Sequence, residues 1–136
     1  MLFVTLAACG GAGDAPVDQP DATLLQVPLV ERFAEVRAIH DAVMPERGRL
    51  VRLQRRLAAS EELGERVRGD ADLRLQRADD MMMDWMYADV PLAELRDSLS
   101  AAELATYLDA REVAIRATAD SMRAAIAHAE GVLGGK

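Results

Sequence analysis

The chain has 136 residues, of which 16 are Lys or Arg and 23 are Asp or Glu, so its formal net charge at pH 7 is −7. A chain of this net charge has no overall basic character to recruit a nucleic acid, so its electrostatics argue against nucleic-acid binding. The apolar run near the start is far shorter than the ~20 residues needed to cross a bilayer. With a single cysteine, the chain also cannot form an internal disulfide.

The first nine residues combine an apolar run with the tetrapeptide Leu-Ala-Ala-Cys, which ends at Cys9. This arrangement resembles the lipoprotein box of bacterial signal peptides, in which the cysteine thiol receives a diacylglyceryl group and the preceding residues are removed. We therefore predict that residues 1–8 are a lipoprotein signal segment and that Cys9 carries palmitate or similar acyl chains. The alternative is a cytosolic helical protein with a ragged start and an incidental cysteine.

The predicted leader departs from a typical signal peptide, since its apolar run is short and no Lys or Arg precedes it. We expect that a basic start was lost upstream. The residue after the cysteine is Gly10 rather than Asp. By similarity to lipoprotein sorting, this residue indicates the outer membrane, with the protein facing the periplasm.

Residues 9–28 begin with a stretch of Gly, Ala, Pro, Asp and Gln that is typical of a flexible tether. Each buried methylene of an acyl chain adds ~0.8 kcal/mol to membrane binding, so a lipidated tether needs no lipid-binding surface on the folded body. Residues 29–133 are then predicted to form one helical domain. Ala, Leu, Arg, Glu and Met dominate there, and these residues favour helix.

The first helix is predicted over residues 30–63, where apolar residues recur at spacings of three and four. Its stripe consists of Phe33, Val36, Ile39, Val43, Leu50, Leu53 and Leu57. Pro45 lies within this stripe, and a proline removes one backbone donor and clashes with the preceding turn. We therefore expect either a kink near residues 40–44 or two abutting helices.

A second helix is predicted over residues 71–87, with Asp70 as its N-cap. Its stripe consists of Leu75, Ala78, Met82 and Trp85, widened by Met81 and Met86. The sequence Asp-Val-Pro at 89–91 ends it, and a short helical turn is predicted at 92–99.

A third long helix is predicted over residues 100–132. It opens with the sequence Ser-Ala-Ala-Glu, in which Ser100 and Glu103 have the spacing of a capping box. Its apolar stripe consists of Leu104, Leu108, Ile115, Met122 and Ile126. No segment shows the alternation of a strand, so the sequence predicts an all-α fold, an antiparallel three-helix bundle.

Charge favours pairing of the first two long helices. Residues 47–56 contain five arginines and no acid, and an antiparallel hairpin would place residue 50 opposite about residue 83. The arginines would then be flanked by Asp79, Asp80 and Asp84. Such surface pairs contribute about 0–1 kcal/mol each, so they select the register more than they stabilise. A patch for an anionic partner is the other interpretation of the arginine run.

Two clusters could hold a soft metal ion: His40 with Met44 on the first helix, and Met82, Trp85 and Met86 on the second. Thioether ligands select Cu(I) over harder ions. By the register above, Met44 could meet Trp85 and Met86, whereas His40 would lie ~12 Å away along the axis unless the kink brought it closer. The alternative is core packing, because Met fills irregular gaps. His40 would then bond a neighbouring carboxylate or carbonyl.

The sequence shows no supporting context for a Ser/His/Asp triad, no Gly-rich phosphate loop and no HExxH or CxxC motif. Its acids lie at helical surface spacing rather than as inward-facing Glu-x-x-His units. We therefore expect neither enzymatic activity nor a cofactor.

The order of these motifs resembles a family of small bacterial lipoproteins often labelled "viral A-type inclusion protein". The resemblance rests on His-Asp-x-Val-Met-Pro at 40–45, Met-Met-x-Trp-Met at 82–86 and the capped final helix, and it covers residues 30–133. It implies a helical body and lipidation of Cys9, but no activity. This chain departs in its short leader and in having Arg where Lys is usual. We therefore predict an envelope lipoprotein with a structural or protein-interaction role, with an adaptor or a Cu(I)-handling module as alternatives.

Overall fold

The computed structural model describes residues 22–135, and these residues form four α-helices and no strand. The helices are α1 (Ala22–Ala58), α2 (Glu65–Tyr87), α3 (Leu92–Ser98) and α4 (Ala101–Gly134). The prediction of an all-α fold is therefore confirmed. None of these four helices combines the length and apolar character needed to cross a membrane. Cys9 and the predicted signal segment 1–8 lie outside the described residues.

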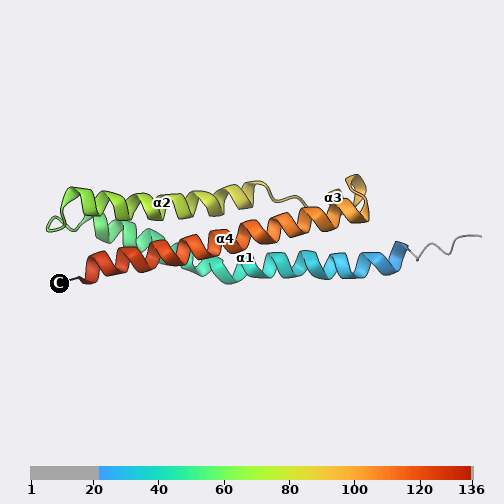
Figure 1. Cartoon of the computed structure of the whole chain (residues 1–136), viewed down its shortest axis with the longest axis horizontal. Coiled ribbons are helices and arrows are strands. Elements are labelled where there is room, and N and C mark those ends of the chain that lie inside the picture. Colours follow the sequence, from blue (N-terminus) through green and yellow to red (C-terminus); the bar gives the residue numbers. More distant parts are fainter. Residues whose placement is uncertain (1–21, 136) are drawn as a thin grey trace, which may run out of the picture.

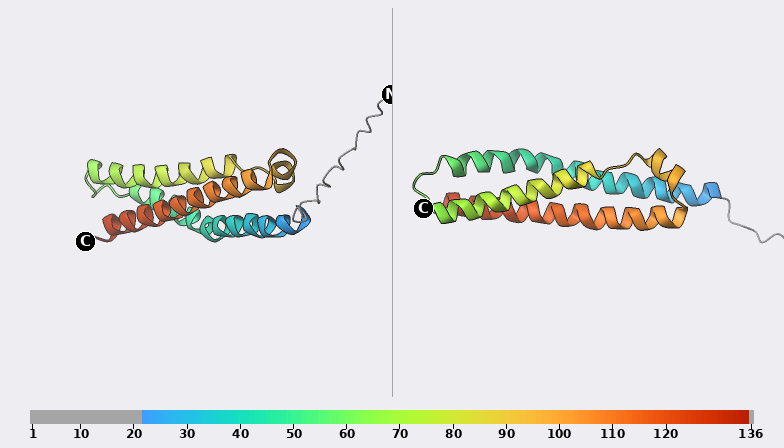
Figure 2. Two further views of the ribbon diagram at one scale, coloured as in Figure 1. Left: turned by 45° about the vertical axis from the view of Figure 1, so that its right-hand side comes forward. Right: turned by 90° about the horizontal axis from the view of Figure 1, so that it is seen from above.

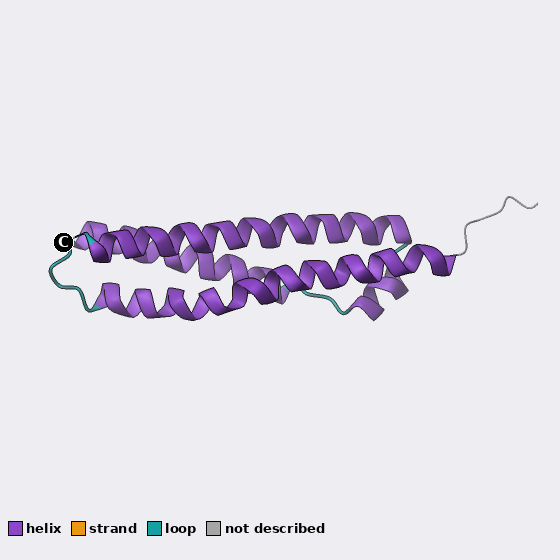
Figure 3. Ribbon diagram, turned by 90° about the horizontal axis from the view of Figure 1, so that it is seen from below, coloured by secondary structure: helices purple, strands orange, loops and turns teal. Residues whose placement is uncertain are grey.

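The three long helices lie side by side along the long axis of the molecule, and α3 lies at the end where α1 begins (Figures 1 and 2). The contacts of α4 with α1 and with α2 are much more extensive than the contacts between α1 and α2. The view from below shows the same arrangement, with nearly all of the described residues in helices (Figure 3). α4 therefore packs more closely against each of the other long helices than those two pack against each other.

The main core contains the apolar stripes predicted for the three long helices. Its larger members are Val36, Val43, Leu50, Leu53, Leu57, Leu75, Met82, Trp85, Ile115, Met122 and Ile126. A second, smaller core at the α3 end contains Leu95, Leu104 and Leu108, against which Leu29 and Phe33 pack. The periodicity therefore identified the buried faces, although it did not divide them into two clusters.

The predicted bounds of the first helix, 30–63, are wrong at both ends, since α1 spans Ala22–Ala58. Pro28 and Pro45 both lie inside one continuous helix, so the alternative of two abutting helices is not observed. At the C-terminal end, the Ser60 hydroxyl donates to the Arg56 carbonyl at 2.8 Å. This bond satisfies one of the carbonyls that a helix end leaves free, while the Ser60 amide bonds the Leu57 carbonyl at 3.1 Å and so departs from the α-helical pattern.

The N-terminal difference also concerns the predicted tether, 9–28, whose last residues belong to α1. A proline inside a helix forfeits one backbone hydrogen bond, and Pro28 is the last residue of the predicted tether. In the structure the helix passes through it, and the Leu29 and Phe33 side chains pack on the second core just beyond. This packing anchors the first part of α1 against the α3 end of the bundle.

The predicted N-cap of the second helix, Asp70, is also wrong. The helix begins at Glu65 after Gly64, and Asp70 lies inside it, where it accepts a hydrogen bond from Arg74 at 2.8 Å. That bond, with His128 at 3.2 Å, holds the pKa of Asp70 below its usual value. Asp70 therefore links α2 to α4 rather than capping a helix.

The start of α4 agrees with the sequence. The Ser100 hydroxyl accepts from the Glu103 backbone amide at 3.3 Å, and the Glu103 carboxylate accepts from the Ser100 amide at 2.8 Å. The predicted capping box is thus confirmed, and α4 runs from Ala101 to Gly134, close to the predicted 100–132. The short helix at 92–99 is confirmed as α3.

Candidate functional site

Trp85 is the centre of the polar cluster that lies within the bundle. It is 5% exposed and is contacted by side chains from both other long helices. The His40 ring of α1 stacks on it, with ring centroids 5.0 Å apart and an interplanar angle of 16°. The Arg111 guanidinium of α4 lies over the same indole, 3.8 Å from its centroid. Three helices therefore meet at one aromatic ring.

Arg111 is 9% exposed, and burying a guanidinium is costly unless its charge and donors are satisfied. Its Nη2 donates to the Trp85 carbonyl at 2.8 Å, and the Trp85 indole nitrogen donates to the Arg111 carbonyl at 3.1 Å. The Asp89 carboxylate lies 3.5 Å from the same Nη2. The indole face adds a cation–π attraction. Arg111 thus fixes α4 to the last turn of α2.

Asp89 joins a second arginine to this cluster. Its other carboxylate oxygen accepts from Arg37 of α1, and the Arg37 guanidinium also lies 5.8 Å from the centroid of the Phe33 ring. Asp89 therefore bridges α1 and α4 just after α2 ends. Two arginines share one carboxylate here, so the three groups carry a net positive charge beside Trp85.

His40 has one satisfied and one unsatisfied ring nitrogen. Nδ1 lies 2.9 Å from the Asp41 carboxylate, as expected for a histidine bonded to a neighbouring acid. Nε2 is buried and has no hydrogen-bond partner among the described residues. A buried polar atom without a partner costs roughly 1–3 kcal/mol. The edge of His40 that carries Nε2 is therefore the one place in the cluster where an additional ligand would be favourable.

The expected distance between His40 and Trp85 is wrong, because the predicted register of α1 and α2 is shifted. Arg47 bonds Asp79 through Nε at 2.5 Å and Nη2 at 3.1 Å, as the charge pattern predicted. Going back seven residues from Arg47 to His40 corresponds to going forward seven residues from Asp79 to Met86, which places His40 beside Trp85. The helix-to-helix turn closes earlier than expected because α1 ends at Ala58.

The other two predicted aspartate partners of the arginine run do not behave as expected. Asp80 and Asp84 form no ion pair with an arginine in the part of the chain that the structure describes, and Arg49 pairs with Glu130 of α4 at 2.6 Å. Arg47 alone bridges to the acids of α2. The arginine run therefore divides between two partner helices, because its members lie on different faces of α1.

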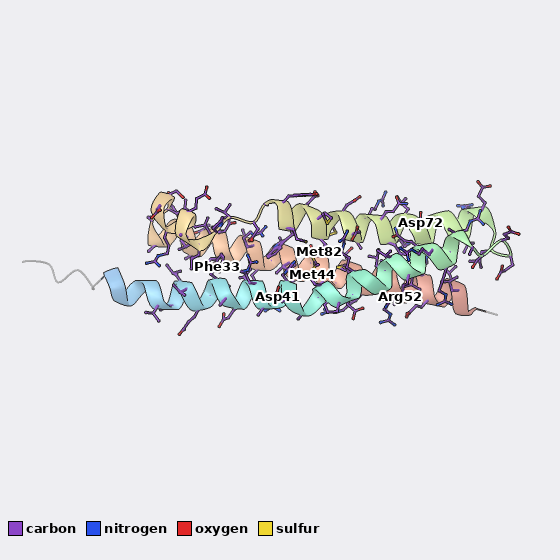
Figure 4. The ribbon with its side chains drawn as sticks, turned by 180° about the vertical axis from the view of Figure 1, so that it is seen from behind. Phe33, Asp41, Met44, Arg52, Asp72 and Met82 are labelled. Carbon is purple, nitrogen blue, oxygen red and sulfur yellow. The ribbon has the colours of Figure 1, made fainter. Side chains whose placement is uncertain are left out.

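The three methionines of the predicted metal site differ in how deeply their side chains are buried. Met82 is fully buried and Met44 packs against the main core, and the two lie at the same level of the bundle (Figure 4). Met86 is 36% exposed. Among the described residues, no group of three or more His, Cys, Asp or Glu side chains could hold a metal ion. The geometry therefore favours core packing for Met82 and brings only His40 and Trp85 together among the predicted ligands.

The sequence predictions missed the charged half of this cluster, Arg37, Asp89 and Arg111. Arg111 offered a signal, since it lies three residues after Leu108 and four before Ile115, inside the apolar stripe of α4. An arginine in such a stripe predicts a buried charge that needs a partner. Asp89 offered none, because it looked like part of the turn that ends α2.

Comparison of the chain with protein-family models, curated proteins and solved structures gave no match in any of the three. The interpretation of the cluster therefore rests on its own geometry. Most polar groups of the cluster are already paired with each other. The arginines form ion pairs with Asp89, the Trp85 indole donates a hydrogen bond to Arg111, and one imidazole nitrogen of His40 bonds Asp41.

Proposed function

We propose that the protein is a bacterial envelope lipoprotein, anchored through acyl chains on Cys9 and exposing a helical body with a structural or protein-interaction role. The lipoprotein box ending at Cys9 is the observation that carries this proposal. The resemblance to the small lipoproteins labelled "viral A-type inclusion protein" supports it. The outer membrane, facing the periplasm, is the proposed location, because Gly10 follows the cysteine.

The proposed body is an antiparallel three-helix bundle in which α1 bends near Pro45. Two contacts support the antiparallel arrangement of α1 and α2, since Arg47 meets Asp79 while the earlier residue His40 meets the later residue Trp85. The ribbon of α1 in Figure 4 changes course between Asp41 and Arg52, which supports the bend. A bend there is expected, because Pro45 has no amide to donate to the preceding turn.

A non-enzymatic role is consistent with the paired charges and the small free volume of the Trp85 cluster. Each of its charged groups has an ion-pair partner, and the space beside Trp85 and Arg111 is about 10 Å³, no more than one water molecule requires. Side chains held this way stabilise a helix junction. We propose that the cluster fixes the relative positions of the three long helices, and that the outer surface carries the interaction.

Mass spectrometry of the protein extracted from membranes tests the proposal. The expected N-terminal peptide begins at Cys9 and carries a diacylglyceryl modification, and cells fed labelled palmitate should yield labelled protein. Cys9→Ala should abolish the label and release the protein from the membrane fraction. An unmodified Cys9 preceded by an intact residue 1–8 segment would contradict the proposal.

A Cu(I)-handling module is the second candidate, and the unpartnered Nε2 of His40 favours it. In this proposal His40, Met44 and Met82 hold the ion, with Trp85 beside it and Met86 at the surface. Anaerobic Cu(I) titration monitored by Trp85 fluorescence should then give stoichiometric quenching. His40→Phe, which retains an aromatic ring on Trp85 but removes the nitrogen, should abolish the quenching, whereas Met81→Leu should not. An unchanged fluorescence in the parent protein would exclude this candidate.

A further inference from the structure

The outer faces of α1 and α2, which are joined by the Arg47–Asp79 ion pair, carry charges of opposite sign. On α1, Arg47, Arg52 and Arg55 form an arginine row that borders a shallow hollow of about 540 Å³ over Met44, Gly48 and Val51. On α2, Asp72 and Asp79 lie two turns apart on the side that faces α1, and the exposed Asp80 follows on the outer side of the helix; these three residues are called the acidic row. Figure 4 shows Arg52 and Asp72 at about the same level on the two helices.

Most of these charges are not neutralised within one copy of the chain. Arg47 and Asp79 form the only ion pair between the rows among the described residues. Arg52 and Arg55 have no ion pair with a described residue, and the same holds for Asp80. Asp72 accepts one hydrogen bond, from the neutral Gln76. Arg52 and Arg55 are also one turn apart on α1, where like charges repel.

The floor of the hollow is suited to close contact. Met44 and Val51 are partly buried against the main core, so each still presents apolar surface. Gly48 lies between them, and a Cβ at this position would meet only the end of the Arg52 side chain, at 3.4 Å. A neighbouring helix could therefore approach the backbone of α1 at Gly48, between two apolar side chains and a charged rim.

We infer that this face binds a second copy of the chain, so that the arginine row of each copy meets the acidic row of the other. A two-fold axis that runs along the bundle between α1 and α2 exchanges the two rows, as an isologous interface requires. An unrelated acidic helix would match the arginine row but would be repelled by the acidic row beside it. A second copy satisfies both rows at once.

The register within one copy supports this pairing. Because Arg47 lies opposite Asp79, Arg52 lies opposite Arg74 and Arg55 opposite Ala71. A two-fold rotation about an axis parallel to the bundle leaves the position of every residue along that axis unchanged, so the register found within one copy also holds between the two copies. Asp72 of one copy therefore comes within ~3 Å along the axis of both Arg52 and Arg55 of the other copy.

This inference deepens the interaction role proposed above, on which it rests, and its test is independent of the lipid anchor. Sedimentation of the full chain carrying Cys9→Ser, which removes both acylation and any disulfide between copies, should show a concentration-dependent dimer. Arg52→Glu/Arg55→Glu should weaken the dimer by roughly tenfold or more, because both rows are then acidic. Asp72→Arg/Asp80→Arg should do the same, because both rows are then basic.

The decisive measurement mixes the two double variants. One presents two acidic rows and the other two basic rows, so neither should associate with itself, and the mixture should form a heterodimer. Arg116→Glu/Arg123→Glu on α4, with the same change in net charge, is the matched control and should dimerise like the parent. Circular dichroism confirms that each variant is helical.

A parent chain that sediments only as a monomer would overturn the inference, as would a mixture that fails to associate. Open-ended oligomers would also contradict it, because a two-fold interface closes at two copies. Any of these results would leave the lipid label on Cys9 unaffected, so failure of the dimer and failure of the lipoprotein proposal are distinguishable.

Discussion

Trp85 and Arg111 exchange hydrogen bonds through each other's backbone carbonyl, at 3.1 Å from the indole and 2.8 Å from the guanidinium. Two residues 26 positions apart in sequence are thus joined twice, and the stacked His40 ring adds a third helix to the junction. The junction lies where α2 ends and where the main core gives way to the second core. It therefore determines how the two cores are aligned.

Arg111→Ala should destabilise the protein strongly. The truncation leaves the buried Trp85 carbonyl without its donor and removes the cation from the indole face, whereas Asp89 keeps its pair with Arg37, so the loss should be about 1–3 kcal/mol. Urea denaturation followed by circular dichroism measures the loss. Arg123→Ala is the control, because Arg123 is 61% exposed and pairs with the exposed Asp120 one turn away, so its effect should stay within about 0.5 kcal/mol. Equal effects of the two substitutions would show that the Trp85 junction contributes little.

The adjacent methionines Met81 and Met82 provide a second matched pair. Met82 is fully buried in the main core, whereas Met81 is 37% exposed. Met82→Ala should lower the free energy of unfolding by about 2–5 kcal/mol, since it removes buried apolar surface and leaves a cavity. Met81→Ala should cost less than about 1 kcal/mol. Thermal or urea denaturation distinguishes them, and a small effect of Met82→Ala would favour a loosely packed site over a core position.

The buried faces of the helices could be predicted from sequence because apolar periodicity reports directly on burial. Leu75, Ala78, Met82 and Trp85 were predicted as one stripe, and all four are buried. The ends of α1 could not be predicted, because a proline such as Pro28 weakens a helix without fixing where it stops. Tertiary packing at the α3 end decides that boundary.

For the candidate site, the sequence identified three of the residues but not which of them lie close together, because that depends on tertiary packing. His40, Met44 and Trp85 attract attention by residue type, but their proximity depends on the register of α1 and α2. Shortening α1 at its C-terminal end shifts that register by about two turns of helix, which brought His40 to Trp85. Asp89 could not be found at all, since its two arginines come from helices far apart in sequence.

Gly69→Ala should stabilise the protein. Gly69 lies inside α2, and a Cβ added there meets nothing within 4 Å. Alanine restricts the unfolded chain and favours helix, so the gain should be about 0.5–1 kcal/mol. Chemical denaturation measures it. Gly135, where a Cβ would lie 3.1 Å from the Gly131 carbonyl oxygen, is the contrasting position and should show no such gain from alanine. A loss of stability in Gly69→Ala would contradict a helical Gly69 with open space beside its Cα.

The capping box at the start of α4 should make stability depend on pH in the acid range. Hydrogen bonds from the Ser100 side chain and backbone hold the pKa of Glu103 below its usual value. A carboxylate with a lowered pKa stabilises the fold above its unfolded-state pKa, and the contribution is lost as the pH falls through its folded-state pKa. Glu103→Gln should therefore lower the melting temperature relative to the parent protein at neutral pH, and the difference should shrink as the pH falls through the folded-state pKa of Glu103.

Melting curves of both proteins across the acid range measure this difference. The control is Glu61→Gln, which changes an exposed glutamate before α2. A difference between Glu103→Gln and the parent that stays constant with pH would mean that the ionised carboxylate does not cap the helix.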